Sequence, residues 1–178
     1  MKNLLLPLCL LLVVAQLAPP ADVPGWQDAR WGMTLGELQK VYGASLVKRE
    51  RDYAVRGDEE KYAYADYYLP LEITGEKFRA GFLMDVNTDK LIGVRVQTAE
   101  DKKYPSEAEG VFEDIEKALG QKYGPAGFAD EERSRSGGSK VRRWTFPTTT
   151  IELKAITGYF NLVVINYTPT RNKDADKL

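Results

Sequence analysis

The chain has 178 residues and a net charge of -1 at pH 7, and 43% of its residues are hydrophobic and 11% aromatic. This composition predicts one folded domain and excludes a disordered chain, because disordered segments lack the apolar side chains that form a core. The sequence has no histidine and a single cysteine, Cys9, which excludes imidazole catalysis and zinc sites built from these residues. The balanced charge gives no general attraction to nucleic acid.

Residues 1–18 have the layout of a secretory signal peptide. Lys2 gives a positive start, residues 4–17 are almost entirely apolar, and Ala15 and Ala18 are small residues suited to cleavage. The apolar run is too short to cross a membrane comfortably as a helix. An uncleaved N-terminal anchor helix is the alternative. The sequence therefore predicts export to the periplasm or the medium, with no stable membrane span after cleavage.

The proline-rich residues 19–25 predict an extended leader between the signal peptide and the folded domain. Cys9 follows Leu6, Pro7 and Leu8, whereas a lipoprotein signal has small residues just before its cysteine, so we expect no lipid anchor. Cleavage of residues 1–18 removes Cys9, and the mature protein is then expected to have no disulfide.

The first half of the domain predicts one short helix over residues 34–42. Thr34 and Glu37 form a capping box, and Gly43 suits the end of a helix. An apolar stripe along one side of this segment consists of Leu35, Leu38, Val41 and Tyr42. Strands follow at residues 62–73, with a bend at Pro70, and at residues 78–86 and 91–97, which form a hairpin.

The second half predicts a longer helix that starts at Ser106, with Glu109 completing a capping box. Its apolar stripe consists of Ala108, Phe112, Ile115, Leu119 and Tyr123, and Gly124 and Pro125 end it. Three strands are expected after it, at residues 141–146, 149–156 and 162–167. Residues 170–178 form a polar tail.

Together these elements predict an α+β fold in which two helices pack on antiparallel β-meanders. Residues 26–103 and 104–169 have the same order of a helix and three strands, which suggests a tandem repeat of two half-repeats. The expected core residues are Leu38, Phe82, Val94, Phe112, Ile115, Leu119, Ile151 and Ile165.

The start of the domain carries a family resemblance. Its residues are Trp31, Gly32, Met33, Thr34, Glu37, Leu38, Tyr42 and Gly43. This stretch resembles the opening signature of small bacterial envelope proteins of the SmpA/OmlA type, and the duplicated layout is similar to that of the beta-lactamase inhibitor protein group. The resemblance implies a non-catalytic role in envelope assembly or protein binding. The chain departs from the SmpA/OmlA pattern because it lacks a lipobox cysteine and carries two units.

Tyrosines in the strand at residues 62–73 are the first candidate binding residues. Tyr62, Tyr64 and Tyr68 are expected on one face of the strand and Tyr67 on the other. Exposed aromatic rings can stack on sugars or anchor a protein partner. Ordinary packing within the sheet is the alternative.

A basic segment at residues 133–140 is the second candidate. Arg133 and Arg135 could contact an acidic partner or anionic envelope polymers. The acidic residues 130–132 cancel much of this charge, so a solvated hairpin connection is the alternative.

Paired carboxylates are the one catalytic device that the composition leaves open. Asp66, Glu72 and Asp85 could meet near aromatic rings, as in a glycosidase, although their spacing does not single them out. The sequence contains neither a calcium-binding loop nor a phosphate-binding loop. We therefore predict no catalytic residue, metal or cofactor. The expected function is a protein-binding or assembly module of the envelope, and the alternative is a carboxylate-dependent glycan hydrolase or a glycan-binding protein.

Overall fold

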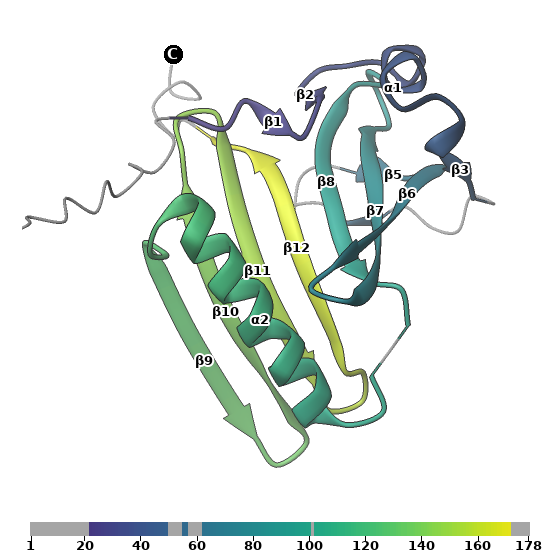
Figure 1. The fold of residues 1–178 in the computed structure, drawn as a ribbon. Coiled ribbons are helices and arrows are strands. Elements are labelled where there is room, and N and C mark those ends of the chain that lie inside the picture. Colours follow the sequence, from purple (N-terminus) through teal and green to yellow (C-terminus); the bar gives the residue numbers. More distant parts are fainter. Residues whose placement is uncertain (1–21, 50–54, 57–61, 101, 172–178) are drawn as a thin grey trace, which may run out of the picture.

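The computed structural model describes residues 22–49, 55–56, 62–100 and 102–171 (Figure 1). The expected signal peptide and most of the polar tail lie outside the described residues. The elements in chain order are β1 (Gly25–Trp26), β2 (Ala29–Arg30), α1 (Leu35–Tyr42), the 3-10 helix η1 (Gly43–Ser45), β3 (Val47–Lys48), β4 (Val55–Arg56), β5 (Tyr62–Tyr64), β6 (Tyr67–Ile73), β7 (Glu76–Asp85), β8 (Leu91–Thr98), α2 (Pro105–Tyr123), β9 (Phe128–Ser134), β10 (Gly137–Thr145), β11 (Thr149–Thr157) and β12 (Leu162–Pro169).

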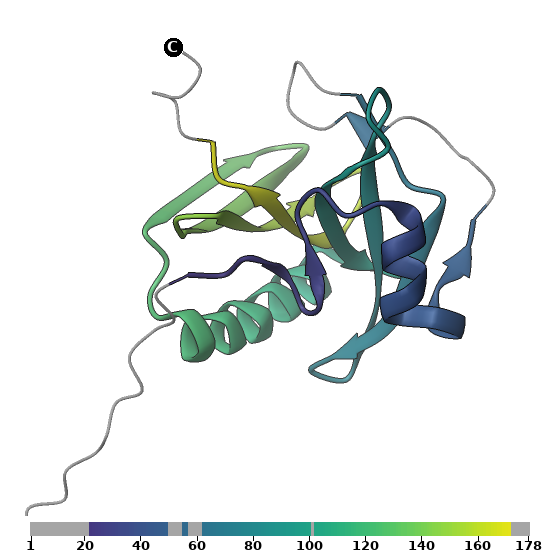
Figure 2. The ribbon, with the colours of Figure 1, turned by 90° about the horizontal axis from the view of Figure 1, so that it is seen from above.

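The α+β prediction is wrong, because the fold is predominantly β. Strands account for 50% and helices for 22% of the structure. One antiparallel sheet of ten strands dominates, with the order β3-β6-β7-β8-β12-β11-β10-β9, and β4 joins it through β5, which pairs with β7. The molecule is therefore a large twisted sheet on which two helices lie, and not a balanced assembly of helices and meanders (Figures 1 and 2).

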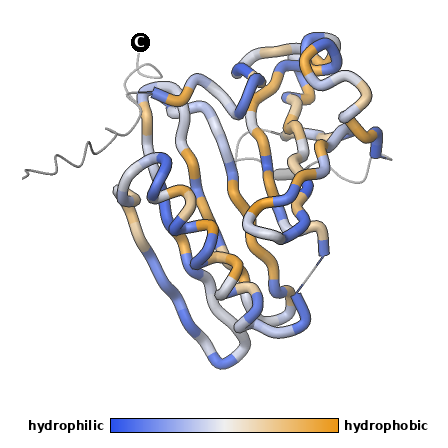
Figure 3. Tube along the Cα trace, in the orientation of Figure 1, coloured by the Kyte–Doolittle hydropathy of each residue, from blue (hydrophilic) through white to orange (hydrophobic). Residues whose placement is uncertain are grey.

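The strand β9 was not predicted from sequence periodicity, and its omission is one reason why the predicted strand content was too low. Every residue of β9 is exposed, so the strand has no alternation of apolar and polar residues. Its backbone pairs with β10, and this register places Glu131 opposite Lys140. Figure 3 shows β9 as one of the most polar segments of the molecule. A charged edge strand of this kind resists pairing with other chains.

The strands β7, β8, β11 and β12 occupy the predicted stretches to within two residues at each end. The predicted strand at residues 62–73 differs, since it divides into β5 and β6 at residues 65–66. Pro70 lies within β6, opposite Arg79 of β7. The pairing of β6 with β3 on its other side involves only Tyr67 and Tyr68, so among the described residues Pro70 has a partner strand on one side only. A position with a partner on one side tolerates a residue without a backbone N–H, and the register of β6 with β7 continues through Pro70 without a shift.

The two halves of the chain meet at the antiparallel pair of β8 and β12. Each of these strands is the last of a meander that follows a helix, and their pairing joins the two meanders into one sheet. The origin of the halves by duplication stays a prediction.

The helix termini give one confirmed and one wrong prediction. In α1 the capping box is present, with Glu37 N–H donating to Thr34 Oγ1 and Thr34 N–H donating to Glu37 Oε2, and Gly43 follows with a positive φ of 53°. In α2 the expected box at Ser106 is absent, because the helix begins one residue earlier at Pro105. Proline favours the first helical position, since its φ is already helical and its missing N–H has no partner there.

Both helices lie on the same face of the sheet. A single row of side chains crosses this face from β7 to β10 and consists of Phe82, Val94, Tyr167, Ile151 and Trp144. At one end, the ring of Phe82 lies 5.2 Å from that of Tyr42 in α1. At the other end, Trp144 Nε1 donates to the carbonyl of Gly124 at the end of α2. All eight expected core residues are buried in one cluster beneath the helices.

Candidate functional site

The sheet face away from the helices carries a row of mostly polar side chains, which we call the polar row. Register places its members side by side from β6 to β9, in the order Tyr68, Gly81, Arg95, Asn166, Glu152, Arg143 and Phe128. Arg95 Nε donates to Asn166 Oδ1 at 3.1 Å, and Arg143 Nη2 donates to Glu152 Oε2 at 2.6 Å. Because strand residues alternate between faces, this row points away from α1 and α2.

The polar row is hollowed at Gly81, which has no side chain. This hollow, the arginine pocket, has a volume of about 80 Å³, and its lining includes Arg49, Arg79, Arg95, Tyr67, Tyr68 and Leu83. Arg95 lies opposite Gly81 in the register of β7 and β8. Arg79 Nη2 donates to the carbonyl of Ala99 at 2.6 Å, while Arg79 Nε is buried without a hydrogen-bond partner among the described residues.

The two central arginines of the pocket differ from other arginines of the sheet in their charge balance. Arg142 forms ion pairs with Glu116 at 2.6 Å and with Glu131 at 2.8 Å. Within the described part of the chain, no ion pair joins a carboxylate to Arg79 or Arg95. Desolvation lowers the pKa of the half-buried Arg95 from its ordinary value, although an arginine stays charged. Among the described residues, the arginine pocket is therefore a positive centre to which no carboxylate is paired.

The structure brings only part of the predicted tyrosine set to this pocket. Tyr67 and Tyr68 both line it. Tyr64 instead donates its hydroxyl to Asp89 Oδ1 at 2.6 Å and packs its ring against the core. The side chain of Tyr62 lies outside the described residues. Tyr64 and Tyr67 both border a small pocket with Phe82 and Met84. The predicted grouping of Tyr64 with Tyr68 is therefore wrong, because the break between β5 and β6 interrupts the alternation, whereas Tyr67 and Tyr68 alternate between faces along β6 as predicted.

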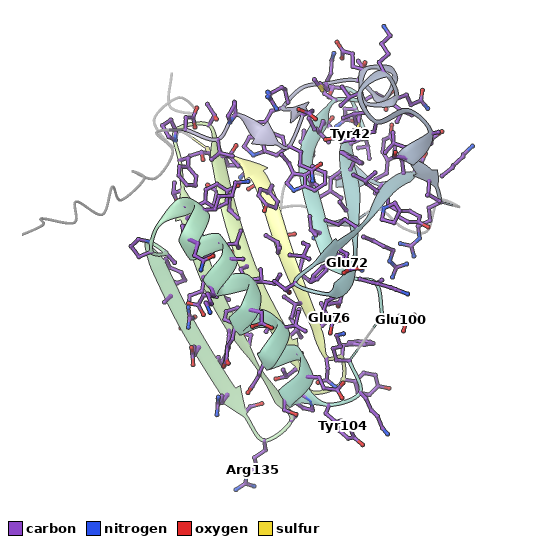
Figure 4. All side chains as sticks on the ribbon, in the orientation of Figure 1. Tyr42, Glu72, Glu76, Glu100, Tyr104 and Arg135 are labelled. Carbon is purple, nitrogen blue, oxygen red and sulfur yellow. The ribbon has the colours of Figure 1, made fainter. Side chains whose placement is uncertain are left out.

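The predicted arginines lie elsewhere, on the hairpin of β9 and β10. Arg133 Nη2 is 3.8 Å from Glu109 Oε1, and Arg135 lies at the exposed tip of the hairpin (Figure 4). Five strand steps separate β6 from β10 along the sheet, which corresponds to about 24 Å at ~4.8 Å per step. The tyrosines and these arginines do not form one site, and the hairpin fits the alternative of a solvated connection.

A larger cleft lies on the helix side of the sheet between α2, β6 and residues 22–27. Its volume is about 540 Å³, and its walls are mainly apolar, with Val23, Leu71, Ile73, Ile115 and Leu119 among them. The α2 wall runs from Ile115 to Tyr123, about 12 Å at 1.5 Å per residue. Trp26, Tyr123 and Tyr167 also border the cleft but are at most 8% exposed, so they do not present open ring faces.

Glu72 does not come together with the other two candidate catalytic carboxylates, Asp66 and Asp85. Glu72 lies opposite Lys77 and at the lip of the cleft, where Figure 4 shows it on the hairpin of β6 and β7. Along the strands it is about 20 Å from Asp66 and about 26 Å from Asp85 at ~3.3 Å per residue. Glycosidase carboxylates need a separation of about 5 to 9.5 Å. Asp85 also caps the β7–β8 turn, where its Oδ1 accepts from the backbone N–H of Thr88 at 2.9 Å.

Ionisation of the carboxyl groups also bears on acid catalysis. Asp22 lines the cleft, and although desolvation acts to raise its pKa, hydrogen bonds from Thr148 and Val23 hold that pKa below its ordinary value. Hydrogen bonds from Thr34 and from Arg142 likewise lower the pKa values of Glu37 and Glu131. A general acid needs the opposite shift. In the described part of the chain, no group of three or more carboxylate or cysteine side chains is placed to hold a metal ion.

Sequence reasoning missed both Arg79 and Arg95. The sequence contains a signal for both, because each is a charged residue between two apolar ones. Arg79 lies between Phe78 and Ala80, and Arg95 lies between Val94 and Val96. Pairing the two strands through the turn at residues 87–89 brings both arginines to the same face. The strand order and the gap left by Gly81 were needed to show a pocket.

Comparison of the chain with protein-family models, with curated proteins and with solved structures finds no significant match. The resemblance to envelope proteins of the SmpA/OmlA type and to the beta-lactamase inhibitor protein group therefore stays a prediction. None of the helices in the described residues has the length and apolar character needed to span a membrane.

Proposed function

We propose that the protein is a non-catalytic, exported binding module of the bacterial envelope whose cleft receives an apolar segment of a protein partner. The observation that carries this proposal is the open cleft of about 540 Å³ between α2, β6 and residues 22–27. Clefts of this size with mainly apolar walls are typical of ligand sites. Amphipathic segments of partner proteins bind in grooves of this kind through a few apolar anchors.

The composition of the cleft favours a protein partner over a glycan. Glycan recognition uses open aromatic faces and many polar groups, whereas Trp26, Tyr123 and Tyr167 are buried. The side chains that remain accessible in the walls include Leu71 and Ile73. The distance of Glu72 from Asp66 and Asp85 and the lowered pKa of Asp22 also weigh against a hydrolase.

Export rests on the N-terminal sequence alone. A positive start, a short apolar run and small residues at Ala15 and Ala18 support cleavage of a signal peptide. The intact mass of the protein from envelope extracts tests this step. A mature chain that begins between Gln16 and Ala21 is expected, and a mass that retains Met1 or includes acyl chains would overturn it.

Crosslinking in envelope extracts, followed by identification of the crosslinked protein, tests the cleft. Ala118 lines the cleft from α2, so Ala118→Trp is expected to fill it and to reduce partner capture at least tenfold. Lys117 is exposed and does not line the cleft, so Lys117→Trp serves as a matched control that leaves capture unchanged. Thermal unfolding of both variants shows that the fold persists.

Two results would reject this proposal. One is equal loss of capture in Ala118→Trp and Lys117→Trp, because the cleft would then not be the binding surface. The other is the absence of any reproducible partner together with glycan hydrolysis that depends on a carboxylate pair, which would favour the enzyme alternative.

A further inference from the structure

We infer that the arginine pocket binds a single carboxylate group between Arg79 and Arg95. This site lies on the sheet face opposite the cleft, so it is independent of the proposed binding of an apolar partner segment. Three features favour it: two arginines without an ion pair among the described residues, the terminal nitrogens of Arg95 that no described residue uses, and the space left by Gly81.

The charge of the two arginines favours an anion in the pocket. Arg79 and Arg95 form no ion pair within the described residues, whereas Arg143 in the same polar row pairs with Glu152. A partly buried charge without a partner is destabilising, and an anion in the pocket offsets that cost. The nearest polar neighbours of Arg95 in the row are Asn166 and the backbone of Gly81, neither of which is charged.

The N–H donors of the guanidinium groups favour a carboxylate as that anion. Arg95 uses Nε to hold Asn166 Oδ1, which fixes the plane of the guanidinium, and no hydrogen bond among the described residues uses its two terminal nitrogens. Two parallel N–H groups of one guanidinium match the two oxygens of a carboxylate. On the other side, Arg79 Nη2 donates to the carbonyl of Ala99, and Arg79 Nε is buried without a hydrogen-bond partner among the described residues.

The lining of the pocket favours a carboxylate over a phosphate. Leu83 and Ala65 contribute apolar surface, and Gly81 contributes empty space. A phosphate has oxygens on all sides and needs donors around it, whereas a carboxylate has an oxygen edge and a hydrocarbon stem. The stem fits the apolar lining beside Tyr68, while the oxygens face the arginines.

NMR spectra of the arginine Nε–H groups of the purified protein test the inference. The probes are sodium acetate, the acetylated and amidated peptide Gly-Glu-Gly, its Gly-Gln-Gly counterpart and inorganic phosphate, all at constant ionic strength. Saturable shifts of Arg79 and Arg95 are expected with acetate and the glutamate peptide, and affinity for the glutamine peptide is expected to fall at least tenfold. Tighter binding of the glutamate peptide than of acetate indicates a carboxylate on a polypeptide, and the reverse indicates a free small acid.

Three variants complete the test. Arg95→Gln removes one charge of the pocket, and Gly81→Ala narrows the pocket, because a Cβ there lies 3.8 Å from Ala65 Cβ and 3.9 Å from the Arg95 carbonyl oxygen, which are ordinary contacts. Both variants are expected to lose the shifts. Arg143→Gln removes the same charge from the same face, three strands away, and is expected to keep them.

Absence of saturable shifts with both carboxylate probes would overturn the inference, as would saturation by phosphate but not by acetate. Equal effects of Arg95→Gln and Arg143→Gln would show that general surface charge, and not the pocket, attracts the anion. Partner capture through the cleft has its own readout, so either proposal can fail while the other stands.

Discussion

At the residue scale, Phe112 shows how helix and sheet depend on each other. Its side chain is fully buried on α2. The guanidinium of Arg142 lies 5.4 Å from the centre of its ring, and that arginine is also paired with Glu116 of the same helix. The ring therefore contributes apolar burial and also a surface on which a cation of β10 is positioned.

Replacement of Phe112 by alanine is expected to reduce the free energy of unfolding by about 3 to 5 kcal/mol, because it removes a large buried side chain and leaves a cavity. Urea denaturation of the variant measures this change. Tyr159 is 94% exposed, so Tyr159→Ala is a control for which we expect a change within about 0.5 kcal/mol. A similar small effect for Phe112→Ala would show that α2 does not pack on the sheet through this side chain.

At the element scale, α1 is a short helix whose start depends on its capping box. Thr34 and Glu37 satisfy each other's backbone N–H groups, and only Leu38 of this helix is buried. A helix of this length is marginal in isolation. Its cap and the contact of Tyr42 with Phe82 therefore anchor it on the sheet.

The capping box predicts a specific dependence of stability on pH. Hydrogen bonds from the backbone N–H and hydroxyl of Thr34 lower the pKa of Glu37 from 4.5. The stabilisation from ionised Glu37 is therefore present above about pH 4.5 and is lost as the pH falls through the lower pKa of the folded state. Glu37→Gln keeps a hydrogen-bonding cap but does not ionise.

We therefore expect the wild type to melt at a higher temperature than Glu37→Gln near pH 7, and the two melting temperatures to converge as the pH falls below the lowered pKa of Glu37 in the folded state. Thermal unfolding followed by circular dichroism across this range measures the difference. A difference that is constant with pH would contradict the role of the charge, and a difference that grows toward low pH would reverse its sign.

At the scale of the whole molecule, the two halves share one sheet and one hydrophobic cluster. The cluster extends from Trp26 to Tyr167. The N-terminal segment also crosses to the second half, where Trp31 Nε1 donates to Thr149 Oγ1 at 2.9 Å and Asp22 Oδ1 accepts from Thr148 N–H at 3.0 Å. These contacts make the halves interdependent even though each has its own helix and meander.

Unfolding is therefore expected to be a single cooperative transition. Tryptophan fluorescence reports on both halves through Trp26 and Trp144, and far-ultraviolet circular dichroism reports on the backbone, so the two urea transitions should coincide. Phe112→Ala, in the second half, should move both transitions together. Two separated transitions would show that the halves are independent folding units.

Local signals in the sequence were sufficient for a large part of the fold. The capping box of α1, the apolar stripe of α2 and the strands β7, β8, β11 and β12 depend on residues only a few positions apart. The errors arise where local information is incomplete. Proline at position 105 competes with Ser106 for the start of α2, and β9 has no apolar alternation because both of its faces are exposed.

The sequence by itself determined which residues form the core, because burial follows apolar periodicity along each element. The binding surface that it predicted at Tyr62, Tyr64, Tyr67 and Tyr68 stays a prediction, and of these residues Tyr67 and Tyr68 line the arginine pocket. The arginine pocket and the apolar cleft could be found only from the tertiary structure. Arg79, Arg95 and Tyr68 come from three strands, and the cleft joins residues 22–27 to α2 and β6. Neither arrangement can be read from spacing in the chain, because strand order and register bring together residues that local periodicity does not relate.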